Sequence, residues 1–352
     1  MRGSRGLLRY VKAICVVAAI GGTACGTSLR GTTVHQKAEP PANVLAVFRV
    51  ESVEELIAPL PFLPKNVHPV TDLDPGGFKI FEDGAAVGTG ESASVTRLDL
   101  GRRLHVLILV DFGGDPSEAD RIVIGDALHG ALVNLQSHTV GVFAFDGSGS
   151  IAELVTSAQP TPAESVRDAI KAFKVRDPST NLHGAVVEAL TGLGATVRDG
   201  PPPVQAGALV LVSRGPDRAG RSSRSDVLAS VREDGQPLLR YAVGVGTVDT
   251  ELLGRVTHGD PAALQTMKDL PAALDTITKQ IAEYGRSHYA LTYCSQAREG
   301  LHKARVEFTR EVKDADGETT TQTGGLDIPF EAKGFRPGCK PTTLPPDLSG
   351  QK

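Results

Sequence analysis

The hydrophobic pattern of the chain changes its period twice. A mostly aliphatic run without alternation covers residues 104–110 and ends on Asp111, which is typical of a strand buried on both faces of a parallel sheet. From there to residue 284, short apolar runs alternate with segments whose apolar residues recur every three or four positions. This alternation predicts strands separated by helices, and therefore a mostly parallel sheet with helices on both faces.

The expected elements follow from these runs. In the middle region we predict strands at residues 104–111, 139–145, 208–212 and 239–245, and helices at 115–132, 163–173, 181–193, 225–233, 250–256 and 274–284. Strand patterns return on both sides, at 43–50, 78–81, 95–100, 288–293, 304–308 and 326–330. The predicted fold class is α/β, a Rossmann-like doubly wound sheet flanked by small β-rich segments at both ends.

The start of the chain has the composition of a targeting segment. Four basic residues and no acid precede a short apolar stretch at residues 13–20, which is too short to span a bilayer as a helix. Small residues then lead to Cys25, so the segment resembles a bacterial lipoprotein signal, although Gly22 stands where that motif carries an aliphatic residue. The resemblance implies lipidation of Cys25, and Gly26 after it implies sorting to the outer membrane. Plain secretion with cleavage near Ala24 is the alternative.

We expect six regions along the chain: a signal at 1–24, a polar tether at 25–41, a β-rich segment at 42–100, the α/β domain at 101–285, a second β-rich segment at 286–341, and a disordered tail at 342–352. Removing the signal takes away four positive charges and no negative ones, so the formal net charge moves from −4 to −8. A mildly acidic surface without clustered Lys and Arg argues against nucleic acid as a partner.

Two cysteines lie outside the signal. Cys294 and Cys339 are an even pair in a chain expected to be exported, which predicts a disulfide between them. They lack a CxxC spacing and a neighbouring histidine, so a zinc site built on them is disfavoured.

Three loops at the predicted carboxyl ends of strands carry polar residues. The first is residues 111–115, the second holds Thr180, and the third is residues 213–217. In this order and spacing the sequence resembles the von Willebrand factor A-type (VWA) domain over about residues 104–284. That family places D-x-S-x-S, a threonine and a T-D-G-like turn in these loops, and together they form a metal-ion-dependent adhesion site. The flanking segments resemble exported bacterial proteins built on this domain.

The chain departs from the metal-site pattern of that family. Asp111 and Thr180 are kept, but Gly113 and Asp115 stand at the two serine positions and Arg214 at the aspartate position. We expect the Arg214 guanidinium to replace the charge of the metal by pairing with Asp111, so that no ion and no cofactor binds. The rival interpretation is a weak magnesium site on Asp111, Asp115 and Thr180 with Arg214 swung out.

Other interpretations of the same residues are simpler. Asp115 and Thr180 are both expected to act as helix caps whatever the metal does. Ser213 and Asp217 complete the candidate partner-binding rim. Enzyme motifs are missing: the sequence has no phosphate loop and no H-E-x-x-H, and residues 146–150 lack the spacing of a serine elbow. Glu82 and Asp83 are taken as a solvated turn.

These features predict a lipid-anchored envelope protein that recognises a protein partner and is not an enzyme. The partner is not identified by the sequence, and the membrane is expected to be reached through the lipid anchor. Two alternatives stay open: metal-dependent adhesion through magnesium, and a structural role in envelope assembly with an inert domain.

Overall fold

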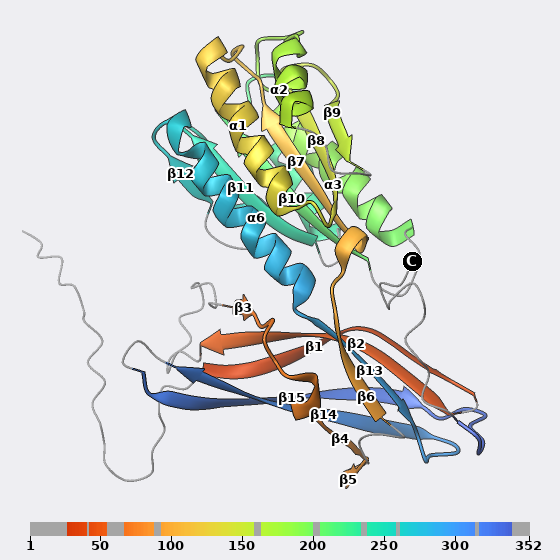
Figure 1. Cartoon of the computed structure of the whole chain (residues 1–352). Coiled ribbons are helices and arrows are strands. Elements are labelled where there is room, and N and C mark those ends of the chain that lie inside the picture. Colours follow the sequence, from red (N-terminus) through yellow and green to blue (C-terminus); the bar gives the residue numbers. More distant parts are fainter. Residues whose placement is uncertain are drawn as a thin grey trace, which may run out of the picture.

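A computed structural model places the elements of the chain in two β sheets, which Figure 1 shows one above the other. It describes residues 27–40, 42–54, 67–87, 93–157, 163–199, 205–233, 238–257, 261–313 and 317–339. We call the six-stranded sheet the central sheet and the nine-stranded sheet the platform sheet.

The central sheet has the strand order β12-β11-β10-β7-β8-β9. Its strands are β7 (Leu104–Asp111), β8 (Thr139–Phe145), β9 (Ala152–Ser157), β10 (Ala206–Ser213), β11 (Leu238–Val245) and β12 (Ala262–Leu264). All neighbours pair in parallel except β8 and β9, which are antiparallel. A mostly parallel sheet with helical connections confirms the predicted α/β class.

Helices cover both faces of the central sheet. They are α1 (Glu118–Asn134), α2 (Ala163–Ala172), α3 (Leu182–Asp199), α4 (Arg224–Glu233), α5 (Thr250–Val256) and α6 (Leu270–Arg286). The alternating side chains of β7 explain why both faces need cover. Ile108 packs into a core with α1, α2 and α6, whereas Leu109 packs into a second core with α3, α4 and α5. Both side chains are fully buried.

The platform sheet joins segments from the two ends of the described chain. Its order is β5-β4-β14-β15-β1-β2-β13-β6, with β3 paired to β2. The strands are β1 (Thr27–Glu39), β2 (Asn43–Glu54), β3 (Val67–Pro69), β4 (Lys79–Glu82), β5 (Ala85–Ala86), β6 (Ala93–Leu98), β13 (His288–Cys294), β14 (Leu301–Lys313) and β15 (Thr319–Glu331). The two β-rich segments predicted at 42–100 and 286–341 therefore belong to one sheet.

Strands β2 and β13 contribute side chains to the core of the platform sheet and to a core of the α/β domain. Phe48 and Tyr289 belong to the apolar core of the platform sheet, while Val47 and Ala290 point the other way and pack with the helices of the α/β domain. The pleat sends successive side chains to opposite faces. In Figure 1, α6 runs directly into β13 at this junction.

The prediction of a tether at 25–41 is wrong over residues 27–39, which form β1. This strand pairs antiparallel with β2 along its whole length, and Leu29 and Arg30 pair in parallel with Gly324 and Gly325 of β15. Apolar periodicity missed β1 because its side chains are mostly polar. Its backbone hydrogen bonds to β2 and β15, more than side-chain burial, place it in the sheet.

Two smaller differences concern local structure. Strands β9 and β12 lie in segments that we predicted as connections. Helix α1 begins at Glu118 and is capped by Ser117, whose hydroxyl accepts from the backbone N–H of Asp120 at 3.1 Å. The predicted N-cap role of Asp115 is therefore wrong. The signal at 1–24, Cys25 and the tail at 342–352 lie outside the described residues.

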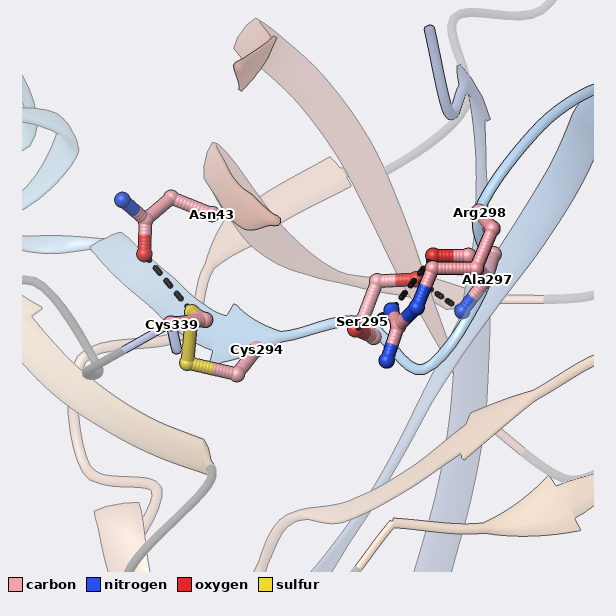
Figure 2. Close-up of a disulfide and its surroundings, with 6 residues drawn as sticks. All are labelled: Asn43, Cys294, Ser295, Ala297, Arg298 and Cys339. Atoms are coloured by element: carbon pink, nitrogen blue, oxygen red, sulfur yellow. Dashed lines mark hydrogen bonds between the residues drawn. A yellow bond between two sulfur atoms is a disulfide. The ribbon is translucent and has the colours of Figure 1, made fainter. Parts of the chain in front are cut away.

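The predicted cysteine pair is joined. Cys294 and Cys339 form a disulfide that links the end of β13 to the segment after β15, and Figure 2 shows it beside Asn43 and Ser295. Within the described parts of the chain, none of the helices combines the length and the apolar character that crossing a membrane requires.

Candidate functional site

The three loops singled out in the sequence meet at the carboxyl edge of the central sheet. The backbone N–H of Gly114 donates to the carbonyl of Pro178 at 2.7 Å, and that of Arg218 donates to the carbonyl of Thr180 at 2.8 Å. We call this surface the rim. Figure 1 shows β7 running away from the platform sheet, so that the rim lies at the end of the molecule opposite the platform.

Asp111 is the buried centre of the rim. Its side chain has no exposure, and its two carboxylate oxygens accept from the backbone N–H groups of Gly113 at 2.7 Å and Arg214 at 2.9 Å. Burial raises the pKa of Asp111 to about 6, while the two N–H donors and the charges of Arg214 and Arg218 act in the opposite direction. The carboxylate thus ties the first loop to the third.

Position 113 has no room for the serine side chain of the adhesion motif. A Cβ atom at this position would overlap Oγ1 of Thr180 and would lie 2.9 Å from Oδ1 of Asp111. The space that a serine side chain requires is therefore filled by the threonine of the second loop. Thr180 is itself buried, so a side chain at position 113 has to displace packed atoms.

Arg214 lies across the first loop. Its Nη1 donates to the carbonyl of Gly113 at 3.1 Å, and its Nη2 lies 3.7 Å from the carboxylate of Asp120. The predicted ion pair between this guanidinium and Asp111 is wrong. The backbone N–H of Arg214, and not its side chain, donates to that carboxylate. The side chain is about one-fifth exposed, so it sits on the rim as a partly covered cation.

Asp115 points away from this centre. Its backbone φ is 49°, and its carboxylate, 66% exposed, pairs with Arg121 at 2.9 Å. Arg121 also donates to the carbonyls of Ile170 and Phe173, so it ties the first loop to the end of α2. Asp115 thus stands at a serine position of the motif without facing Asp111.

The second and third loops meet at the start of α3. The N-cap role predicted for Thr180 is wrong, because Oδ1 of Asn181 is the acceptor for the backbone N–H of Gly184 at 3.2 Å. Asp217 is largely buried and accepts from the backbone N–H of His183 at 3.0 Å. The hydroxyl of Ser213 donates to the carbonyl of Gly215. Asp217 and Ser213 thus both hold the backbone of the rim.

A second aspartate at the rim was missed by the sequence interpretation. Asp146 comes directly after β8, whereas Asp111 is the last residue of β7, and the buried carboxylate of Asp146 accepts from the backbone N–H groups of Ser148 and Arg176, both at 2.7 Å. Residues 146–150 read D-G-S-G-S, which is the D-x-S-x-S spacing after the neighbouring strand. That spacing was the available signal.

A second arginine also lies on a loop carbonyl. Nε of Arg221 donates to the carbonyl of Gly147 at 2.6 Å, and Nη2 donates to the carboxylate of Asp177 at 3.3 Å. Arg221 comes from the same loop after β10 as Arg214. Two guanidinium groups of one loop therefore hold the two loops that follow β7 and β8.

No family model and no curated protein sequence matches the chain. Among solved structures, proximal thread matrix protein 1 from the mussel byssus matches at 13% identity and a TM-score of 0.42, over 52% of this chain. The match spans about half of that protein, 49% of its length.

Two further solved structures match over more of this chain. A von Willebrand factor type A protein from Catenulispora acidiphila has 10% identity and a TM-score of 0.45, over 90% of this chain and 76% of that one. The ArnB paralog VWA2 from Sulfolobus acidocaldarius has 15% identity and a TM-score of 0.38, over 86% and 75%. Likenesses of this size say nothing of activity, and the fold class rests on the strand order of the central sheet.

Proposed function

We propose that the chain is a cell-envelope lipoprotein whose α/β domain recognises a protein partner through the rim, without a bound metal and without catalysis. The observation that carries this proposal is the position of Arg214, whose guanidinium donates to the carbonyl of Gly113 between the first and third loops. A fixed cation of the protein thus lies next to the place where the adhesion motif holds its ion.

The donor set of the rim is poor for a divalent cation. Magnesium takes six oxygen ligands in a near-ideal octahedron, but Gly113 offers no hydroxyl, Asp115 is turned to Arg121, and each oxygen of Asp111 already accepts an N–H. A divalent ion about 4 Å from a guanidinium meets on the order of 8 kcal/mol of repulsion at an effective dielectric near 20. That is about the binding free energy of a micromolar site.

The arrangement of the rim favours recognition of a protein. Arg218 is exposed and close enough to Asp111 to lower its pKa, so the rim offers cations in place of an ion that a ligand carboxylate could coordinate. Protein partners are recognised through such charged surfaces. Nucleic acid is disfavoured because the chain without its signal is acidic overall.

Lipidation of Cys25 fits the position of the first strand. Because β1 begins at Thr27, one residue separates Cys25 from the platform sheet. An anchored chain would hold this sheet close to the outer membrane and the rim at the opposite end (Figure 1). Envelope localisation is therefore compatible with a partner that approaches from the periplasm.

The test is capture of partners from envelope extracts by the whole chain, with and without a chelator. We expect the captured proteins to be the same in both conditions and to be lost with Arg214→Ala and Arg218→Ala. Arg198→Ala is the matched control, because Arg198 is an exposed arginine near the end of α3 that pairs with its neighbour Asp199. Capture that disappears with the chelator would support metal-dependent adhesion instead. Capture that survives both rim variants would support a structural role of the platform or the helices.

A further inference from the structure

A second group of polar side chains lies on the platform sheet, outside the rim. The turn between β4 and β5 brings Asp83 to His302 at the start of β14, with 2.6 Å between Oδ2 and Nδ1. Glu82 precedes Asp83, and one donor atom from each of the three residues lies within 4.8 Å of the others. The set combines two carboxylates with one imidazole.

The backbone fixes the side chain of Asp83. Asp83 and Gly84 have φ values of 49° and 87°, as the two central residues of a type I′ hairpin turn require. The backbone N–H of Lys303 donates to Oδ1 of Asp83 at 3.0 Å. Oδ2 of Asp83 is thereby directed at His302.

His302 has the orientation of a metal-ligating histidine. Its Nε2 lies 2.9 Å from the carbonyl oxygen of Glu299, and a proton on Nε2 donates to that carbonyl. Nδ1 donates to Oδ2 of Asp83 when no ion is bound, so a metal ion at Nδ1 has to take the place of that proton. Histidines that ligate metals commonly donate their other N–H to a carbonyl or carboxylate in this way.

Glu82 is held by the segment that follows the disulfide. Its Oε1 accepts from the hydroxyl of Ser295 at 2.9 Å and from the backbone N–H of Ala297 at 3.3 Å. Figure 2 shows Ser295 directly after Cys294, which is bonded to Cys339. The disulfide thus fixes the segment that orients Glu82.

A buried phenol faces the same group. Tyr293 is 1% exposed. Burial raises the pKa of Tyr293 most, and the charge of Glu82, a hydrogen bond with Glu82 and the charge of Asp83 act in the same direction. Its ring meets Phe330, and Phe330 in turn packs against the ring of His302. The buried phenol thus adjoins the Glu82, Asp83 and His302 group.

We propose that Glu82, Asp83 and His302 bind a divalent transition-metal ion of the zinc class on the platform sheet. One imidazole nitrogen with two carboxylates suits zinc, whereas magnesium and calcium prefer oxygen ligands alone. Bonds of about 2.0–2.2 Å place tetrahedral donors roughly 3.3–3.6 Å apart, so small movements of exposed side chains close the site. The ion would fasten the edge hairpin β4–β5 to β14.

The test is calorimetric titration of zinc into the whole chain, purified without a histidine tag, with its disulfide intact and metal removed beforehand. We expect saturable binding of one ion. Glu82→Gln, Asp83→Asn and His302→Asn should each weaken it about tenfold or more. Asp83→Asn keeps the turn, because asparagine also tolerates the left-handed conformation. Asp327→Asn is the matched control, since it removes an exposed, ion-paired aspartate of β15 and should leave zinc affinity unchanged.

Three outcomes would overturn the site. One is the absence of saturable zinc binding up to ~1 mM. Another is binding that survives His302→Asn in a chain whose circular dichroism is unaltered. The third is tighter binding of calcium than of zinc. A crystal of the zinc-treated chain adds a direct readout, with the anomalous signal expected between Asp83 and His302; a signal elsewhere in the chain contradicts the proposal.

Discussion

At the scale of single residues, the absence of a side chain at Gly113 determines how the rim packs. Gly113 lets Oγ1 of Thr180 approach the first loop, and Arg214 lies over the carbonyl of the same glycine. Thr180 fills the space that a serine side chain takes in the adhesion motif. Arg214 supplies positive charge where that motif holds an ion. Residue identity at three positions therefore decides which chemistry the rim offers.

Gly113→Ser tests this packing. Its Cβ would overlap Thr180, so we expect the free energy of unfolding to fall by about 1–3 kcal/mol, as for overpacked cores, and to recover in part when Thr180→Ala is added. Gly149→Ser is the control, because nothing lies within 4 Å of a Cβ at that exposed position. Urea unfolding measures all three; equal midpoints for Gly113→Ser and the wild type would show that the rim is looser than described.

His288 gives a prediction for pH. It is fully buried at the junction of the two sheets, and burial with the nearby charge of Arg49 lowers its pKa to about 3, although the backbone of Tyr284 and Gly285 acts in the opposite direction. The unfolded chain binds a proton near pH 6.5 and the folded chain does not. The free energy of unfolding is therefore not reduced by this group above pH 6.5. It falls by up to about 5 kcal/mol as the pH falls from 6.5 toward 3.

His288→Phe keeps the edge-to-face ring contact with Tyr284 and cannot be protonated. We expect its unfolding free energy, measured by urea at each pH, to fall less steeply than that of the wild type between pH 6.5 and 3. Curves that stay parallel over that range would mean that His288 gains a partner or solvent in the folded chain.

At the scale of elements, the sequence was most informative where burial imposes a period. The apolar runs that became β7 and β10 are buried on both faces, and β8 and β11 pair beside them as expected. β1 was not foreseeable in this way, because hydrogen bonds to two neighbours order a polar strand without an apolar stripe. The start of α1 was misassigned because Asp115 and Ser117 are both good caps, and only the fold turns Asp115 to Arg121.

Rim residues divide in the same manner. Asp111 and the loops around it were predictable, since a charge at the end of a buried parallel strand must lie at the ligand-binding edge. The hydrogen bond from Arg221 to the carbonyl of Gly147 and the hydrogen bond that Asp146 accepts from Arg176 were not predictable. Both depend on contacts between segments far apart in sequence. The grouping of Glu82 with His302 likewise needs the pairing of β4 with β14.

Gly324→Ala tests how β1 is held. A Cβ at Gly324 would overlap the carbonyl of Leu29, so we expect the contact between β1 and β15 to open. Hydrogen exchange at the amides of β1 should quicken, and the unfolding free energy should fall by about 1–3 kcal/mol. Gly77→Ala, where nothing lies within 4 Å of the added Cβ, should leave exchange in β1 unchanged. Unaltered exchange in the Gly324 variant would contradict the pairing.

At the scale of the whole molecule, the platform sheet joins the two ends of the described chain. Strands from both ends of the described chain pair within it, and the disulfide between Cys294 and Cys339 spans a separation of 45 residues. This framework carries the α/β domain on β2, β13 and α6, and it leaves the rim free at the far end (Figure 1).

Removal of the disulfide should weaken the framework without altering the rim. On the loop-entropy account, replacing both cysteines by serine costs about 4 kcal/mol of unfolding free energy. Urea unfolding of the double variant, compared with the wild type under oxidising and reducing conditions, measures this cost. A difference near zero under oxidising conditions would mean that the bond does not form in the native chain.

The central claim is that arginine and packed side chains have replaced the ion at the rim. Calorimetric titration of magnesium into the whole chain tests this most directly, with Asp111→Asn titrated alongside. We predict no saturable magnesium binding in the micromolar range and the same trace for both proteins. Micromolar binding in the wild type that disappears with Asp111→Asn would contradict the account.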